Sequence, residues 1–279
     1  MTARGNSRPT GKAPPASPEA SPPVRRGQAL ACTCVGVMVT SLPYVGLWAA
    51  DHLVGLMGLL AALALLTATA WRSGSGAALR VCLIAVFVQL QVVCFGLIFW
   101  PGPLLVAVVL VWLASLRWKR LRPALQWLRP GAMGGSVLAL MGITVLLSTA
   151  ALVAWAHLTD PAVGSYLASL RDHPAALAIA GVFAFSLVNS LCEEGVYTGA
   201  FLHELRQLTA TAPALVVQSA GFGMLHFQGF PSGAVGVVMA TFYGLMLGLI
   251  RVRSRGMLAP YLTHVLADVT IGFVAIYLL

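Results

Sequence analysis

The sequence predicts an all-α fold, a polytopic transmembrane helical bundle of about 8–9 spans. Of its 279 residues, 59% are hydrophobic and only 9% are charged, and the mean hydropathy is +0.88. Several apolar stretches run to about 20 residues, the length that a helix needs to cross the hydrocarbon core of a bilayer. Apolar strands of a soluble α/β protein are only about 4–8 residues long, so that class of protein is excluded.

The chain divides into three parts along its length. Residues 1–27 are rich in Pro, Ser, Gly and Ala and contain little to bury, so we expect a disordered cytoplasmic tail. The apolar run after it is too long for a cleavable signal peptide and is expected to remain as the first span. Residues 28–174 then form N-terminal transmembrane helices to which we assign no role, and residues 175–279 form a transmembrane core. The expected spans are 28–50, 53–71, 80–100, 102–116, 132–157, 175–203, 212–229, 232–250 and 256–278.

Basic residues fall on one side of this arrangement of spans. If Arg25 and Arg26 are cytoplasmic, all other Lys and Arg residues except Arg171 lie in cytoplasmic segments. Because such residues are enriched in cytoplasmic loops, we expect a multi-pass integral protein of a bacterial-type cell membrane with a cytoplasmic N-terminus. The basic clusters then indicate contact with anionic membrane lipids, and no nucleic-acid partner is needed to explain them.

Five ionisable residues lie inside the expected spans: Glu193, Glu194, His226, His264 and Asp268. A charge at the centre of a bilayer costs roughly 2.5–3.5 kcal/mol on insertion scales, so such residues usually mark a function. With a helical rise of about 1.5 Å per residue, they lie at similar depths, roughly 12–20 Å from the cytoplasmic ends of their helices. We therefore expect one shared site.

The spacing of these residues divides their roles. His264 and Asp268 are four residues apart, so both project from one face of their helix. Glu193 and Glu194 are adjacent and diverge by about 100° around theirs. At most one of the two glutamates can then be a central catalytic group, while the other supports it.

Three motifs carry a resemblance to a known family. Glu193-Glu194, then FGMLH (222–226), then HVLAD (264–268), resemble the EExxxR, FxxxH and HxxxN or HxxxD motifs of the CPBP family. That family includes the CAAX prenyl endopeptidases and bacteriocin-processing membrane proteins. The resemblance covers about residues 175–275 and implies that this part is a CPBP-like catalytic core.

One position departs from the family pattern. Thr198 occupies the place of the arginine in the first motif. An arginine four residues after Glu194 would pair with that carboxylate, whereas a threonine offers only a neutral hydroxyl. Either Glu194 is protonated, or another donor replaces the missing cation.

The resemblance implies an intramembrane endopeptidase that cleaves a peptide bond near the C-terminus or the leader of a lipidated or membrane-anchored protein. Glu193 is then the general base that activates a water, with His226 beside it, and Glu194 is the supporting carboxylate. His264 and Asp268 orient the scissile carbonyl or stabilise the oxyanion. On this interpretation no cofactor is needed.

Three alternatives remain open. Glu193, His226 and His264 have the ligand types of a hydrolytic zinc site, although the HExxH spacing that favours zinc is absent. Thr198 leaves room for a non-catalytic CPBP-like membrane protein that acts in immunity or as a scaffold. Intramembrane Glu, Asp and His residues also form the relays of proton-coupled transporters, but the sequence lacks the repeated polar pattern of inverted-repeat carriers.

Overall fold

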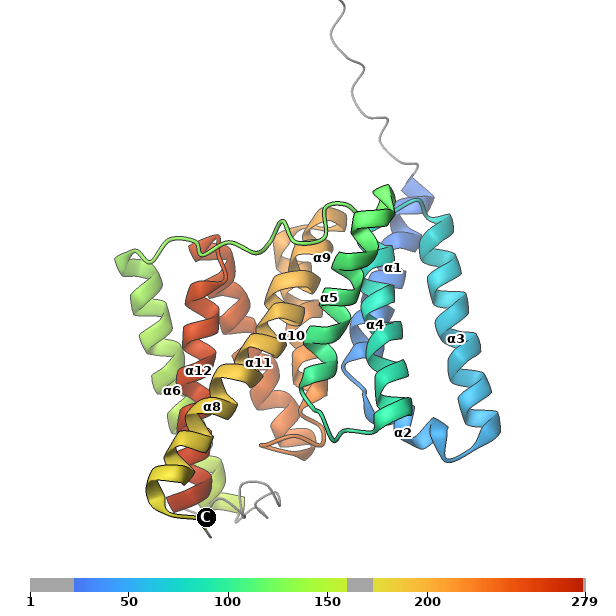
Figure 1. Cartoon of the computed structure of the whole chain (residues 1–279). Helices are drawn as coiled ribbons and strands as arrows, with labels where there is room; N and C mark the ends of the chain where they lie inside the picture. The colour runs from blue at the N-terminus through green and yellow to red at the C-terminus, as the bar shows by residue number, and fades with distance from the viewer. Residues whose placement is uncertain (1–22, 160–172, 278–279) are drawn as a thin grey trace, which may run out of the picture.

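The computed structural model describes residues 23–159 and 173–277, and every regular element within them is a helix. The helices lie side by side as a bundle (Figure 1). The predicted polytopic helical bundle is confirmed in its fold class. The elements, in chain order, are α1 (Pro23–Thr40), α2 (Tyr44–Ala50), α3 (Leu53–Arg72), α4 (Gly76–Phe95), α5 (Gly102–Arg117), the 3₁₀ helix η1 (Lys119–Leu121), α6 (Gly135–Thr159), α8 (Ala175–Glu194), the π-helix η2 (Gly195–Phe201), α9 (Leu202–Leu208), α10 (Thr211–Leu225), α11 (Gly233–Ser254) and α12 (Leu258–Tyr277).

Six helical segments of the described chain are long and apolar enough to cross a membrane. They are α3, α4, α6, the continuous segment Ala175–Leu208 that joins α8, η2 and α9, and finally α11 and α12. Two further apolar helices, α5 and α10, are shorter. The structure therefore supports a multi-pass membrane protein.

The first expected span differs from the structure in two ways: it is interrupted, and its helix begins earlier than expected. The expected span 28–50 is divided into α1 and α2 by residues 41–43. Pro43 stands at the N-cap of α2, and a proline cannot donate the backbone bond that would continue a helix. At the other end, α1 begins at Pro23, so residues 23–27 of the expected tail are helical, and residues 1–22 lie outside the described residues.

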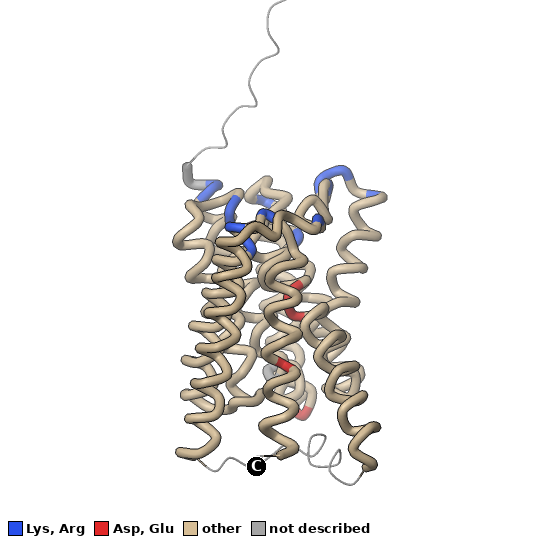
Figure 2. Tube along the Cα trace, turned by 90° about the vertical axis from the view of Figure 1, so that its left-hand side faces the viewer, with Lys and Arg blue, Asp and Glu red and all other residues tan. Residues whose placement is uncertain are grey.

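The Lys and Arg residues gather at one end of the bundle, and the opposite end has none among the described residues (Figure 2). This distribution agrees with the one expected from the sequence. Arg171, the single exception there, lies outside the described residues. By the positive-inside rule we predict that the basic end is cytoplasmic.

Two glycines let the helices of the C-terminal core approach closely. A Cβ atom on Gly244 of α11 would lie 2.9 Å from the ring of Phe222 on α10, and one on Gly272 of α12 would lie 2.5 Å from Val182 on α8. Both distances are too short for a real Cβ contact. Small residues at such positions bring backbones together, which allows side chains as short as Asp and Glu to meet between helices.

Candidate active site

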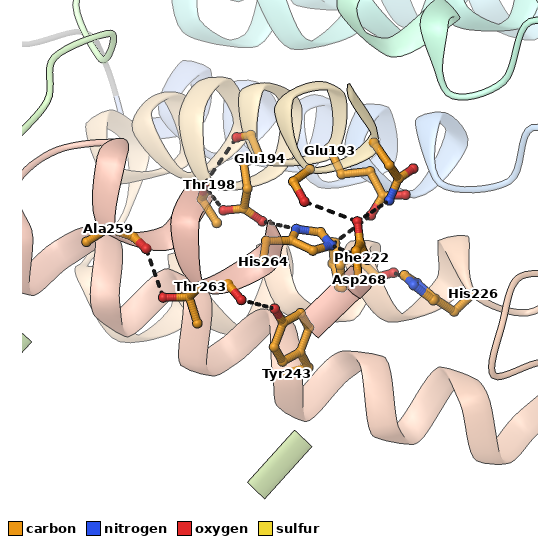
Figure 3. A network of polar contacts seen from close by, with 12 residues as sticks. Glu193, Glu194, Thr198, Phe222, His226, Tyr243, Ala259, Thr263, His264 and Asp268 are labelled. Carbon is orange, nitrogen blue, oxygen red and sulfur yellow. Dashed lines mark hydrogen bonds and ion pairs between the residues drawn. The ribbon is translucent and has the colours of Figure 1, made fainter. Parts of the chain in front are cut away.

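His264 of α12 lies at the centre of a buried cluster of three carboxyl groups. Its Nδ1 lies 2.9 Å from Oε1 of Glu194, and its Nε2 lies 3.5 Å from Oδ1 of Asp268 and 3.7 Å from Oε2 of Glu193. All four residues are between 1% and 7% exposed. Figure 3 shows the imidazole between Glu194 on one side and Glu193 and Asp268 on the other. The structure thus brings together four of the five residues predicted from the sequence.

The two glutamates end α8, where the chain changes from α-helix to the π-helix η2. A π-helical turn carries an extra residue per turn, and such turns occur frequently at functional sites. Within η2, the Thr198 hydroxyl lies 2.6 Å from Oε2 of Glu194 and 3.2 Å from the Glu194 carbonyl oxygen. Glu194 is therefore contacted by Thr198 on one carboxyl oxygen and by His264 on the other.

Asp268 is fixed by two donors from α8. Asn189 Nδ2 and Ser190 Oγ each donate a hydrogen bond of 3.1 Å to Asp268 Oδ2. Both donors lie one helical turn before the glutamates and therefore share their side of α8. Ser190 is a further residue of the site, and its position four residues before Glu194 is the signal for it in the sequence.

His226 occupies a different local structure from the one expected. The sequence predicted a span over 212–229 with His226 inside it, but α10 ends at Leu225 and His226 is its C-cap. His226 Nδ1 lies 3.1 Å from the carbonyl oxygen of Phe222. Because a carbonyl oxygen can only accept, Nδ1 carries the proton, and the other ring nitrogen of a neutral His226 is an acceptor.

Two cavities meet at the site. The larger has a volume of about 390 Å³ and is lined mainly by apolar side chains of α6, α11 and α12, together with His226, Tyr243, His264 and Asp268. The smaller has a volume of about 250 Å³, and its lining includes Glu193, His226 and Asp268. His226 and Asp268 line both cavities. The cavities thus link His226, which lies apart from the cluster, with the carboxylates and His264.

The residues of the alternative zinc set are not gathered into one group in this structure. Within the described segments, no three His, Cys, Asp or Glu side chains form a group that could hold a metal ion. Nδ1 of His264 lies next to Glu194 and Nδ1 of His226 next to the Phe222 carbonyl, which leaves Nε2 of each ring as the nitrogen that a metal ion would use. The ligand types of Glu193, His226 and His264 thus suit zinc, and zinc dependence stays a prediction to be tested.

Comparison with known proteins found a family model that matches the C-terminal core. Residues 174–270 match a family model described as type II CAAX prenyl endopeptidase Rce1-like. This region is therefore similar to the CPBP and CAAX protease family. Curated proteins and solved structures gave no match. The matched residues extend from the start of α8 into α12 and include the whole cluster, so the resemblance drawn from the three motifs is confirmed, and the family implies CAAX-type intramembrane protease activity.

The first CPBP motif also gains a structural interpretation. Where the family has an arginine, Thr198 contributes a hydroxyl to Glu194, and His264 approaches the same carboxyl group from the other side. Of the two explanations considered for the missing cation, the geometry favours replacement by other donors.

Proposed function

We propose that the protein is a glutamate-dependent intramembrane endopeptidase that hydrolyses a peptide bond near the C-terminus or the leader of a lipidated or membrane-anchored protein. One observation carries the assignment of the base. Glu193 Oε2 is buried and has no hydrogen-bond partner, and Glu193 lines the smaller cavity. A buried acceptor without a partner is costly, and a water in the cavity would satisfy it.

In this mechanism, Glu193 takes a proton from that water as its oxygen attacks the scissile carbonyl carbon, and later returns the proton to the leaving amine. His226, whose free ring nitrogen is an acceptor, helps to hold the same water in the smaller cavity. Glu194 and Thr198 orient His264 through its Nδ1. No metal ion takes part in these steps.

Asp268 has a narrower role than the sequence suggested. As a carboxylate that accepts hydrogen bonds from Asn189 and Ser190, it cannot also donate one to an oxyanion. We assign it to positioning, since its second oxygen lies 3.5 Å from His264 Nε2.

The larger cavity supports an apolar substrate. Its apolar lining on α6, α11 and α12 could hold a lipid chain or apolar side chains next to His264. The family description names CAAX prenyl endopeptidases, whose substrates carry a prenylated cysteine close to the C-terminus. A prenylated C-terminal peptide is therefore the first probe to test.

The test is hydrolysis of a quenched fluorescent peptide with a farnesylated C-terminal Cys-a-a-X sequence by the full-length protein in lipid nanodiscs. Glu193→Gln keeps the shape of the side chain and removes the base, so we expect a loss of about 10²–10⁴-fold in kcat. Asp51→Asn, an exposed carboxyl change at the end of α2, is the matched control and is expected to retain full activity.

Cleavage at wild-type rate by Glu193→Gln would refute the mechanism. The second candidate function is that of a non-catalytic relative, which the neutral Thr198 favours. Binding of the farnesylated peptide by wild-type protein, with no cleavage of it, would support that function and contradict the protease proposal.

A further inference from the structure

The residues identified above meet one requirement of peptide hydrolysis, stabilisation of the oxyanion, only in part. Attack on a carbonyl places negative charge on its oxygen, and preorganised donors that stabilise this oxyanion are usually a large part of the catalysis. Both ring nitrogens of His264 face carboxyl groups, and the proton on Nδ1 of His226 is directed to the Phe222 carbonyl. The three carboxylates are acceptors. Nε2 of His264, at 3.5 and 3.7 Å from its carboxylate neighbours, is the donor that the cluster can turn toward an oxyanion, and a second donor has still to be found.

Tyr243 of α11 supplies a hydroxyl at this place. Its ring meets the imidazole of His264 edge-on, with the ring centroids 5.5 Å apart and the planes at 82°. Figure 3 shows its hydroxyl directed toward α12 beside His264. Tyr243 also lines the larger cavity together with His264 and Asp268. The phenol thus lies on the side of the cluster where the apolar substrate is proposed to enter.

The hydroxyl of Tyr243 is only weakly engaged. It donates to the carbonyl oxygen of Thr263 over 3.4 Å, close to the limit for a hydrogen bond. An oxyanion is a much better acceptor than a neutral carbonyl, and hydrogen bonds to charged groups are shorter and stronger. A small rotation of the phenol can therefore exchange the Thr263 carbonyl for a charged oxygen of the substrate.

We propose that Tyr243 is a further catalytic residue, whose hydroxyl donates a hydrogen bond to the oxyanion of the tetrahedral intermediate. This inference rests on the proposed function. As the water oxygen bonds to the carbonyl carbon, the π electrons of the carbonyl move to its oxygen and Glu193 accepts the water proton. Tyr243 keeps its proton throughout. When the C–N bond breaks, the carbonyl re-forms and Glu193 gives the proton to the amine.

The competing explanation is that Tyr243 only packs the site. Its ring also contacts Phe222, with centroids 6.2 Å apart, so removal of the whole side chain would disturb the core on either explanation. Tyr243→Phe separates the two, because it keeps the ring and removes only the hydroxyl. Tyr261→Phe is the matched control, since Tyr261 on α12 is bonded through its hydroxyl to the Leu187 carbonyl at 3.3 Å on an exposed surface.

The experiment measures kcat, KM and thermal stability of both variants with the farnesylated peptide. For Tyr243→Phe we expect kcat to fall by about 10²–10³-fold, as for loss of one oxyanion donor, while KM and stability stay close to wild type. Tyr261→Phe should match wild type in all three. A kcat for Tyr243→Phe that stays at the wild-type value while Glu193→Gln is inactive would overturn the role of Tyr243 but leave the protease mechanism intact. Full activity of Glu193→Gln would instead overturn the protease mechanism.

A binding measurement gives a second, independent result. A farnesylated peptide with a phosphinate in place of the scissile amide carries a charged tetrahedral group that resembles the intermediate. If Tyr243 contacts the oxyanion, Tyr243→Phe binds this phosphinate more weakly than wild type but binds a product peptide equally well. Equal affinity of both proteins for the phosphinate would refute the contact.

Discussion

Replacing Thr198 by Val tests how Glu194 is held without the arginine of the family. The substitution keeps the β-branched shape of a side chain that is only 1% exposed and removes its hydroxyl. Glu194 Oε2 then loses the donor that lies 2.6 Å away. His264 remains as the partner of the other carboxyl oxygen, at 2.9 Å from its Nδ1.

The structure gives the size of the expected effect. Glu194 is 1% exposed, so water cannot replace the lost donor without rearrangement. A hydrogen bond to a charged group contributes about 1.5–3 kcal/mol, and we expect Thr198→Val to lower the free energy of unfolding by about that amount. The same hydrogen bond positions Glu194, and through it His264, in the transition state. Because each 1.36 kcal/mol of activation free energy corresponds to about tenfold in rate, losing this support should lower kcat by about tenfold or more.

The matched control is Thr33→Val on α1. Thr33 is fully buried, and its hydroxyl bonds only to the Ala29 carbonyl of its own helix, at 2.8 Å. Because that carbonyl keeps its helical N–H partner, we expect a loss of about 1 kcal/mol or less and no change in kcat. Denaturant unfolding in mixed micelles and hydrolysis of the farnesylated peptide measure both effects. Equal stability and equal kcat for the two variants would refute the conclusion that Thr198 holds Glu194.

Three further predictions concern a buried ion pair, a close helix contact and the removal of metal ions. Arg80 contacts both carboxyl oxygens of buried Glu204, at 2.6 and 2.5 Å, so Arg80→Met should cost about 3–5 kcal/mol in unfolding experiments, and adding Glu204→Met should recover much of the loss. Gly199→Ala places a Cβ 2.7 Å from the Trp127 ring and should cost about 1–3 kcal/mol of stability, whereas Gly195→Ala meets open space and should cost nothing measurable. Treatment with EDTA should leave peptide hydrolysis unchanged; inhibition that zinc reverses would contradict this.

The depth of the candidate site could be predicted from the sequence, because a helix fixes how far each residue lies along its axis. Glu193 and Glu194 on one helix and His264 and Asp268 on another were expected at one level, and the structure brings these four together. Depth alone does not fix rotation around the axis. The π-helix after Glu194 changes that rotation, and GVYTGAF (195–201) contains no sequence signal for a π-helix.

The supporting residues could not be predicted, since each has an ordinary role in most helices. Ser190 and Thr198 are of types that usually bond back to the carbonyl four residues earlier, and Tyr243 is of a type common in apolar cores. The packing of α8 and α11 against α12 gives Ser190 and Tyr243 their partners in the site, whereas Thr198 bonds to Glu194 on its own helical segment. The end of α10 before His226 was missed for a related reason, because the backbone bonds of Phe227 and Gly229 form turns, and apolar composition does not reveal these.

Contacts from outside the matched region reach η2 and α9, directly beyond the glutamates. Ser41, at the end of α1, lies within 3.0 Å of the Tyr197 hydroxyl in η2, and Arg80 of α4 holds Glu204 of α9. Tyr197 in turn packs edge-on against Phe222 of α10, with the ring centroids 5.5 Å apart. The segment that carries Thr198 is thus fixed by α1 and α4 on one side and by α10 on another. Because these contacts hold the segment that carries Thr198, the N-terminal helices contribute to the geometry of the site although they supply none of its proposed catalytic residues.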